Sequence, residues 1–295
     1  MKYRKYYLKD IPVNFEKLIC KDDHSDFYQS MDFAVTIRIL NMGTAVFFIN
    51  EERSFYILAY ETLKESNRLI INRPNCEELL FSILKEIRYC YDEIMIITDR
   101  RTIVKNYIDE VKTSSVFVTP VIDLTQSPDL ILKGYSSMRR NIVKRAKSKS
   151  FSITIDPSGL NISLFYNMYQ ATMKRKGYYD EFYAETQFCE LLQLESYQLA
   201  LCEYEGSTAA GIILINHGDR VEGRYVSVEN GLKKVNAGSF LTDYCIQYFA
   251  AIPCKRYYDF SGYTSLQNAG DEFSGINKFK MSFGPKLKKY YVITI

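Results

Sequence analysis

The sequence predicts an α/β (α+β) protein of two domains in tandem, each a mixed, mostly antiparallel sheet flanked by helices. Three observations lead to this class. The 295 residues exceed one average domain of about 150 residues, and 47% hydrophobic with 25% charged residues is typical of a globular protein. Short strands also alternate with amphipathic helices along both halves. The expected boundaries are an N-terminal domain over 1–126, a linker helix over 127–149 and a C-terminal domain over 150–295.

Composition excludes several classes of protein. A net charge of +3 is too small to indicate a polyanion partner by itself. The seven cysteines form no CxxC pair and the two histidines lie in no ligand motif, so we expect no metal. Such cysteine usage suits a reducing, cytoplasmic compartment. No apolar run is long enough for a transmembrane segment, and the basic start MKYRKYYLKD lacks the apolar stretch of a secretory signal.

The N-terminal half has strand-like and helix-like segments in alternation. β-branched and aromatic runs predict strands at 33–40, 44–49, 54–60, 93–99 and 114–124, the last interrupted at Pro120. Apolar residues at helical spacing predict helices over 76–90 and 102–111, with Thr102 as the N-cap of the second.

Residues 127–149 predict one basic amphipathic helix. Ser127 and Pro128 are typical of a helix start, and no acidic residue occurs from 130 to 155. A solvated linker face is one interpretation, and binding of a phosphate group is the other. The apolar stripe is Ile131, Tyr135, Met138, Ile142 and Ala146, and the cations are Lys133, Arg139, Arg140, Lys144, Arg145, Lys147 and Lys149.

The C-terminal half again alternates strands and helices, but its sequence does not repeat that of the first half. Helices are expected at 161–176, 187–195, 236–250 and 275–284, and strands at 151–155, 197–204, 208–216, 221–229, 257–262 and 288–295. Turns at 205–207 and 217–220 join the middle strands as hairpins.

The loop after Val228 could hold an anion. Small residues at a helix N-terminus let backbone N–H groups approach a phosphate, and the helix dipole favours negative charge there. The alternative is an ordinary strand-to-helix loop with a serine cap. If this loop binds the phosphates of a cofactor, the residues expected to do so are Val228, Lys234, Asn236, Ala237, Gly238 and Ser239.

Two further motifs carry chemistry-bearing side chains. Asp259 stands inside the aromatic segment YDFSG, where a carboxylate must be hydrogen-bonded or used. Lys280 lies beside the apolar face that Phe279 forms with Ile276 and Phe283, so its ammonium could point into a cleft. A turn-capping aspartate and a solvated lysine are the plain alternatives.

Together these motifs resemble the FemAB-like branch of the GNAT acyltransferase superfamily. The resemblance is strongest over 120–290 and looser over 30–120. It implies two tandem GNAT-like domains with the main active cleft in the second. The matching segments, in order, are VIDLTQSPDLILKGYSSMRRNIVKRAKSKSFSITI, FYNMYQATMKRKGY, YDFSGY and GINKFKMSFG.

The resemblance implies an N-acyltransferase that moves an acyl group from an acyl-CoA-type donor to an amine of an amino sugar or cell-envelope precursor. Aminoacyl-tRNA-dependent transfer to a peptidoglycan precursor is the second reading, and a catalytically silent protein that binds a nucleotide or a membrane surface is the third. The donor is a co-substrate rather than a permanent cofactor, and the partner is a small-molecule or nucleotide-linked amine.

The resemblance also suggests roles for single residues. Lys280 and Phe279 match the motif whose lysine lies by the transferring carbonyl, while Arg139 and Arg140, with Lys144 beside them, match the basic helix that contacts substrate. Such a transfer needs a proton acceptor and a stabiliser for the oxyanion, and Asp259 or Glu229 is the candidate acceptor. Two features depart from the family: 234–239 replaces the usual donor-loop pattern of GNAT enzymes, and no coiled-coil arm is present.

Overall fold

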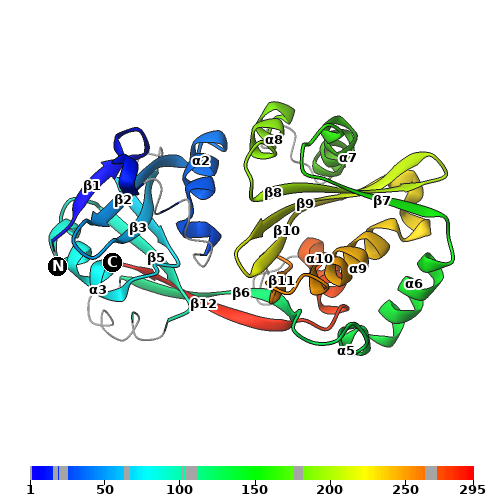
Figure 1. The fold of residues 1–295 in the computed structure, drawn as a ribbon. Coiled ribbons are helices and arrows are strands. Elements are labelled where there is room, and N and C mark those ends of the chain that lie inside the picture. Colours follow the sequence, from blue (N-terminus) through cyan, green and yellow to red (C-terminus); the bar gives the residue numbers. More distant parts are fainter. Residues whose placement is uncertain are drawn as a thin grey trace. The chain divides into compact units, whose positions relative to one another are not determined.

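The computed structural model describes residues 2–15, 19, 26–62, 67–100, 103, 112–175, 182–262 and 271–295 (Figure 1). The chain divides into two compact units. Unit 1 comprises Met1–Phe117 with Lys289–Ile295, and unit 2 comprises Val118–Lys288. The last strand therefore belongs to the first unit, and the basic segment 127–149 lies within the second, which differs from the boundaries expected from the sequence.

Unit 1 is a mixed sheet with the strand order β1-β2-β3-β4-β5-β12. Its pairs are antiparallel except β4 with β5, which is parallel. The apolar side of α3 packs on this sheet in a buried core that includes Leu80, Ile83 and Ile96. The elements are β1 (Arg4–Tyr7), η1 (Leu8–Asp10), η2 (Phe27–Gln29), α2 (Met31–Ile39), β2 (Gly43–Asn50), β3 (Phe55–Thr62), β4 (Arg68–Asn72), α3 (Glu77–Ile87), β5 (Glu93–Thr98), β6 (Thr113–Asp123, shared with unit 2) and β12 (Lys286–Thr294).

Unit 2 is a second mixed sheet, ordered β6-β11-β10-β9-β8-β7. Here β10 and β11 are the parallel pair, and the other pairs are antiparallel. Helices α7 and α8 cover one face, and α6, α9 and α10 lie on the other (Figure 1). The elements are α5 (Pro128–Gly134), α6 (Ser137–Lys147), β7 (Phe151–Asp156), α7 (Ile162–Arg175), α8 (Glu185–Leu191), β8 (Tyr197–Tyr204), β9 (Ser207–His217), β10 (Arg220–Val228), η3 (Asn230–Val235), α9 (Ala237–Ala250), β11 (Tyr257–Asp259) and α10 (Asp271–Met281).

The predicted fold class is confirmed, since both units are mixed, mostly antiparallel sheets flanked by helices. The strand predicted at 33–40 is wrong, because residues 33–39 lie in α2 and Leu40 is its C-cap. Ser30 caps this helix by accepting a hydrogen bond from the Phe33 N–H, and Phe33 and Ile37 are buried on one side of it. Tertiary burial here outweighs the β-branched composition. Strands β1 and β4 were not predicted, and all but one residue of the helix expected at 102–111 lie outside the described residues.

The basic segment forms two helices rather than one. α5 ends at Gly134, Tyr135 is extended with a ψ of 148°, and Ser136 caps α6 by accepting from the Arg139 N–H. At this break Tyr135 is buried, and its ring packs against the ring of Phe283. Pro120 does not interrupt β6, which is continuous over Thr113–Asp123, and the Pro120 carbonyl accepts from the Phe260 N–H just past the end of β11.

No helix in the described ranges is both long and apolar enough to span a bilayer.

Candidate functional site

The parallel strands β10 and β11 of unit 2 part soon after they meet. They pair from Arg220 with Tyr257 to Glu222 with Asp259, while β10 continues to Val228. After Asp259 the pairing with β10 ends, while the Phe260 N–H still donates to the Pro120 carbonyl of β6. Among the described residues, the edge of β10 beyond Glu222 therefore pairs with no strand on the side of β11.

A β-bulge lies where the strands part. Gly223 pairs with Leu214 and Tyr225 with Ile213 of β9, so Arg224 is the extra residue. In a regular strand, residues 223 and 225 would point to the same face of the sheet. Because of the extra residue, they point to opposite faces here. A Cβ at Gly223 would lie 2.8 Å from the Tyr258 Oη, so a larger residue there would have to displace the fully buried Tyr258 side chain. Tyr225 instead contacts Tyr169 of α7, with ring centroids 6.2 Å apart.

A cavity of about 710 Å³ occupies this parting. Its walls come from α7 on one face of the sheet, from α9 and α10 on the other, and from β10 between them. The cavity is therefore open to both faces of the sheet. Its aromatic lining residues are Tyr169, Tyr183, Tyr225, Tyr258, Phe260 and Phe279, its cations are Arg175, Arg224, Lys233 and Lys280, and its described lining contains no carboxylate and no histidine.

Lys280 lines the cavity from α10. Its Nζ donates to the carbonyl oxygens of Ser261 and Gly262, both at 2.7 Å. Ser261 has a positive φ of 56°, and its N–H is fixed by the Asp259 carboxylate at 2.8 Å. The ammonium is therefore held at the end of β11, beside the place where the two strands part. Phe279 lines the same wall.

The loop predicted to bind phosphates also reaches the cavity. Asn236 adopts a left-handed conformation with a φ of 65° and begins α9. Val228, Asn236, Gly238 and Ser239 line the cavity, as does Lys233. A Cβ on Gly238 would lie 2.7 Å from the Val228 Cγ2, so strand and helix approach each other closely. Ala237 is fully buried, and Lys234 is exposed; neither is among the lining residues.

The two candidate proton acceptors lie outside the cavity lining. Asp259 is fully buried, and its carboxylate accepts from Arg220 at 2.6 Å and from Thr119 at 3.2 Å. Glu229 caps η3 by accepting from the Gly231 N–H at 3.3 Å. Asp259 is thus placed to hold the turn at Ser261 rather than to face a ligand directly.

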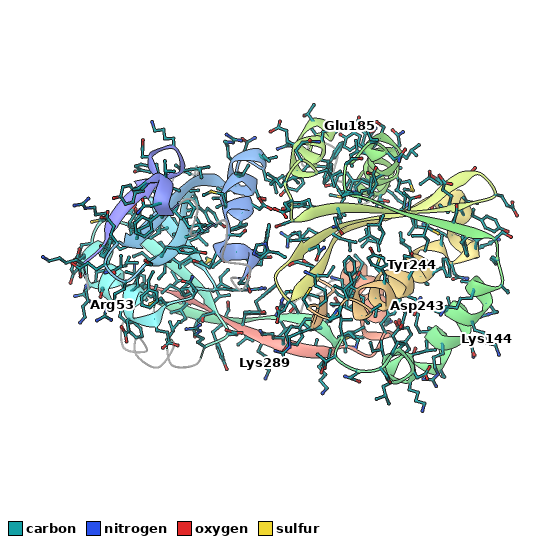
Figure 2. All side chains as sticks on the ribbon, viewed as in Figure 1. Arg53, Lys144, Glu185, Asp243, Tyr244 and Lys289 are labelled. Atoms are coloured by element: carbon teal, nitrogen blue, oxygen red, sulfur yellow. The ribbon has the colours of Figure 1, made fainter. Side chains whose placement is uncertain are left out.

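The cations of the basic segment are mostly engaged within the protein. Arg140 donates to the carbonyl oxygens of Lys133 and Tyr135, and Lys147 forms an ion pair with Asp243 at 3.1 Å. Lys144 lies exposed on α6 (Figure 2). None of these cations lines the cavity. Most cations of the basic segment, which suggested phosphate binding in the sequence, therefore bind other groups of the protein instead.

Arg139 has the most unusual position of these cations. It is only 5% exposed, and its guanidinium lies 4.6 Å from the ring centroids of both Phe279 and Phe283. Its Nε donates to the Ser282 Oγ at 2.8 Å, and its Nη1 donates to the Ser239 Oγ. Burial lowers the pKa of this guanidinium. Arg139 thus contacts the cavity wall from behind.

Sequence reasoning missed several lining residues, among them Tyr169, Tyr183, Arg224 and Tyr225. Arg224 donates to the buried Glu222 at 2.9 Å and to the Ser261 Oγ at 3.2 Å. The segment EGRYV looks like an ordinary alternating strand. Its glycine was the one available signal, since glycine inside a strand often marks a bulge.

Comparisons with known proteins place this geometry in a fold class. No protein-family model matches the chain, and no curated protein matches it. Among solved structures, FemX has a TM-score of 0.74 at 13% identity, covering 99% of this chain and 97% of its own.

Two other solved structures are similar over most of their length. The C-terminal domain of a putative lysylphosphatidylglycerol synthetase from Agrobacterium fabrum has a TM-score of 0.66 at 12% identity, covering 95% of this chain and 91% of that one. A tandem GNAT protein from the clavulanic acid biosynthesis pathway has a TM-score of 0.50 at 9% identity, covering 100% and 98%. The chain therefore has a tandem GNAT fold. Over nearly its whole length the chain has the fold of FemX, which agrees with the fold that the sequence motifs predicted.

Proposed function

We propose that the protein is a transferase that moves an acyl or aminoacyl group to an amine. The observation that carries this proposal is the parting of β10 and β11, because it opens one cavity to both faces of the sheet. Two ligands can then meet at the strand edge from opposite sides. The fold similarity to FemX and to the synthetase domain supports the same class.

The two faces of the cavity suit different ligands. On the α9 side, Lys233, the start of α9 and Ser239 favour an anionic donor. The edge of β10 beyond Glu222, which pairs with no described strand on the side of β11, lies beside the donor's chain. On the α7 side, Tyr169 and Tyr225 form an aromatic wall for the acceptor. The acceptor's amine then reaches the donor's carbonyl beside Lys280.

The chemistry needs no covalent enzyme intermediate. The neutral amine attacks the carbonyl carbon, a C–N bond forms, and the bond from carbon to the leaving sulfur or oxygen breaks. The Lys280 ammonium is placed to stabilise the tetrahedral oxyanion. Because the described lining has no carboxylate, we assign the amine's proton to the departing thiolate or alkoxide, which leaves as the thiol or alcohol.

The preferred substrates are an acyl-CoA-type donor and an amine of an amino sugar or cell-envelope precursor. Aminoacyl-tRNA as the donor is the alternative within the same chemistry. A tandem GNAT protein that binds its ligand without turnover is the alternative outside it, and the absence of a lining carboxylate in the described residues is the observation that favours it.

A transfer assay tests the proposal. Purified protein is incubated with a series of acyl-CoA donors and amino sugars, and the released thiol and the amide product are followed by mass spectrometry. Lys280→Met should lower kcat by about 10²-fold, the usual effect of losing one oxyanion donor. Lys278→Met is the matched control, because Lys278 is exposed on the same helix and does not line the cavity.

The other outcomes separate the alternatives. Transfer from an aminoacyl-RNA minihelix but not from any thioester would favour the tRNA-dependent reaction. Donor binding by calorimetry without any product would favour the silent binding protein. Equal turnover in wild type and Lys280→Met would remove Lys280 from the mechanism.

A further inference from the structure

Arg139 is a buried cation whose contacts in the described structure are all uncharged. Its hydrogen-bond acceptors are the hydroxyls of Ser239 and Ser282, and its other close neighbours are the rings of Phe279 and Phe283. No carboxylate of the described residues forms an ion pair with it. A buried charge is costly unless it is paired. Two hydroxyls and two aromatic rings offset only part of that cost.

The position of this charge links it to the cavity. Ser239 lies in the first turn of α9 and lines the cavity, while Arg139 lies behind it and does not. The Ser239 Oγ accepts from Arg139, so its own proton remains to be donated. A hydroxyl that accepts from a cation becomes a stronger donor. The cation would therefore strengthen a hydrogen bond that the Ser239 hydroxyl donates into the cavity.

We infer that Arg139 is the buried counter-charge for an anionic group bound against Ser239 and the start of α9. This inference rests on the proposed function, because it assigns the negative charge of the donor to that end of the cavity. The anion is a phosphate of a nucleotide-linked donor, and Arg139 acts on it as a positioning residue, through Ser239, without touching it. The relay runs from the Arg139 Nη1–H to the Ser239 Oγ, and from the Ser239 O–H to a phosphate oxygen.

Charge and shape can be separated with two variants of Arg139. Arg139→Lys keeps the charge but loses the planar fork, while Arg139→Gln keeps a hydrogen-bond donor and loses the charge. The probe is inorganic pyrophosphate, titrated by calorimetry, with thermal melts in parallel. Arg139→Gln should weaken pyrophosphate binding by about tenfold or more, the scale of one charge-assisted hydrogen bond. Arg139→Lys should retain most of the affinity.

The matched control is Arg145→Gln, because Arg145 lies exposed on the same helix and outside the cavity lining. Its affinity should equal that of the wild type. A role that is only structural would lower the melting temperature of both Arg139 variants without separating their pyrophosphate affinities. Such a result, or a wild type that does not bind pyrophosphate, would overturn the inference. If Arg139→Gln does not fold, Ser239→Ala is the deciding variant, because loss of the Ser239 hydroxyl must also weaken the binding of pyrophosphate.

The same variants identify the source of the phosphate. Coenzyme A and a short RNA ending in CCA are titrated separately, and the true donor class is the one whose affinity falls in Arg139→Gln. The outcome is independent of the transfer assay. Charge-dependent pyrophosphate binding without turnover would support the anion site and contradict the proposed transferase. Turnover with equal pyrophosphate affinities in both Arg139 variants would support the transferase and contradict the anion site.

Discussion

Asp259 shows how one residue can support a site that it does not face. Its carboxylate is fully buried, accepts from Arg220 at 2.6 Å, and fixes the Ser261 N–H at 2.8 Å. The carbonyl of Ser261 in turn accepts from Lys280. The acidic residue and the cationic one that sequence reasoning grouped together are therefore connected through a single turn. Asp259 orients Lys280 by holding that turn in place.

This position predicts a stability defect for Asp259→Asn. Removing one partner of a buried ion pair leaves the Arg220 charge uncompensated, so the free energy of unfolding should fall by about 3 kcal/mol. Urea unfolding measures this loss of stability. Asp219→Asn is the control, because Asp219 is exposed and lies beside β11, where its carbonyl accepts from the Tyr257 N–H. If Asp259→Asn instead kept its full stability and lost turnover, Asp259 would be the proton acceptor after all.

At the scale of elements, the contact between β10 and α9 determines the shape of the donor end. A Cβ at position 238 would lie 2.7 Å from the Val228 Cγ2, well inside normal contact. The Gly238 carbonyl also accepts from the Thr242 hydroxyl at 2.8 Å, which fixes the first turn of α9. A side chain at 238 must therefore displace either Val228 or the helix start.

Gly238→Ala tests this contact against helix propensity. Propensity alone favours alanine by about 1 kcal/mol, whereas overpacking costs about 1–3 kcal/mol. We expect a net loss of stability and weaker donor binding, and a still larger loss with Gly238→Val. The double variant Gly238→Ala with Val228→Ala should recover the stability. The control is Gly134→Ala, where an added Cβ meets nothing within 4 Å. Unchanged donor affinity in folded Gly238→Val would contradict the assignment.

The sequence predicted elements well where local periodicity decides them. Residues 197–204 form β8 with the expected bounds, and the helix expected at 236–250 begins one residue later as α9. The prediction failed where tertiary contacts decide the structure. The residues of α2 have a strand-like composition, but they form a helix because its apolar side is buried. The same limit applies to the site. Lys280 and Gly238 were predicted from local motifs, but the bulge at Arg224 and the burial of Arg139 depend on neighbours far apart in the sequence.

At the scale of the whole molecule, unit 1 is made from two distant stretches of chain. β12 pairs with β5 from Tyr291 with Thr98 to Thr294 with Met95, and Ile293 is fully buried in the core of unit 1. Tyr290 is also fully buried, with its ring centroid 4.2 Å from the guanidinium of Arg73. The first unit therefore depends on the last strand for part of its core.

A fragment of residues 1–117 should accordingly lack a cooperative thermal unfolding transition. Adding residues 289–295 through a short glycine-rich linker should restore one. The linker is feasible because the rings of Phe117 and Tyr290 lie 6.2 Å apart, at the two points where the chain leaves the unit. Circular dichroism melts measure both fragments, and an equally cooperative transition without β12 would show that the strand is dispensable.

The late arrival of β12 has a consequence for synthesis on the ribosome. Residues 118–288 are translated between the two parts of unit 1, which takes about 10–30 s at the usual rates of about 5–20 residues per second. Throughout that interval the nascent first unit presents the edge of β5, the kind of unpaired strand that recruits other chains. The sheet of unit 1 is therefore completed only once residues 289–295 have been translated, and its N-terminal stretch needs protection from aggregation until then.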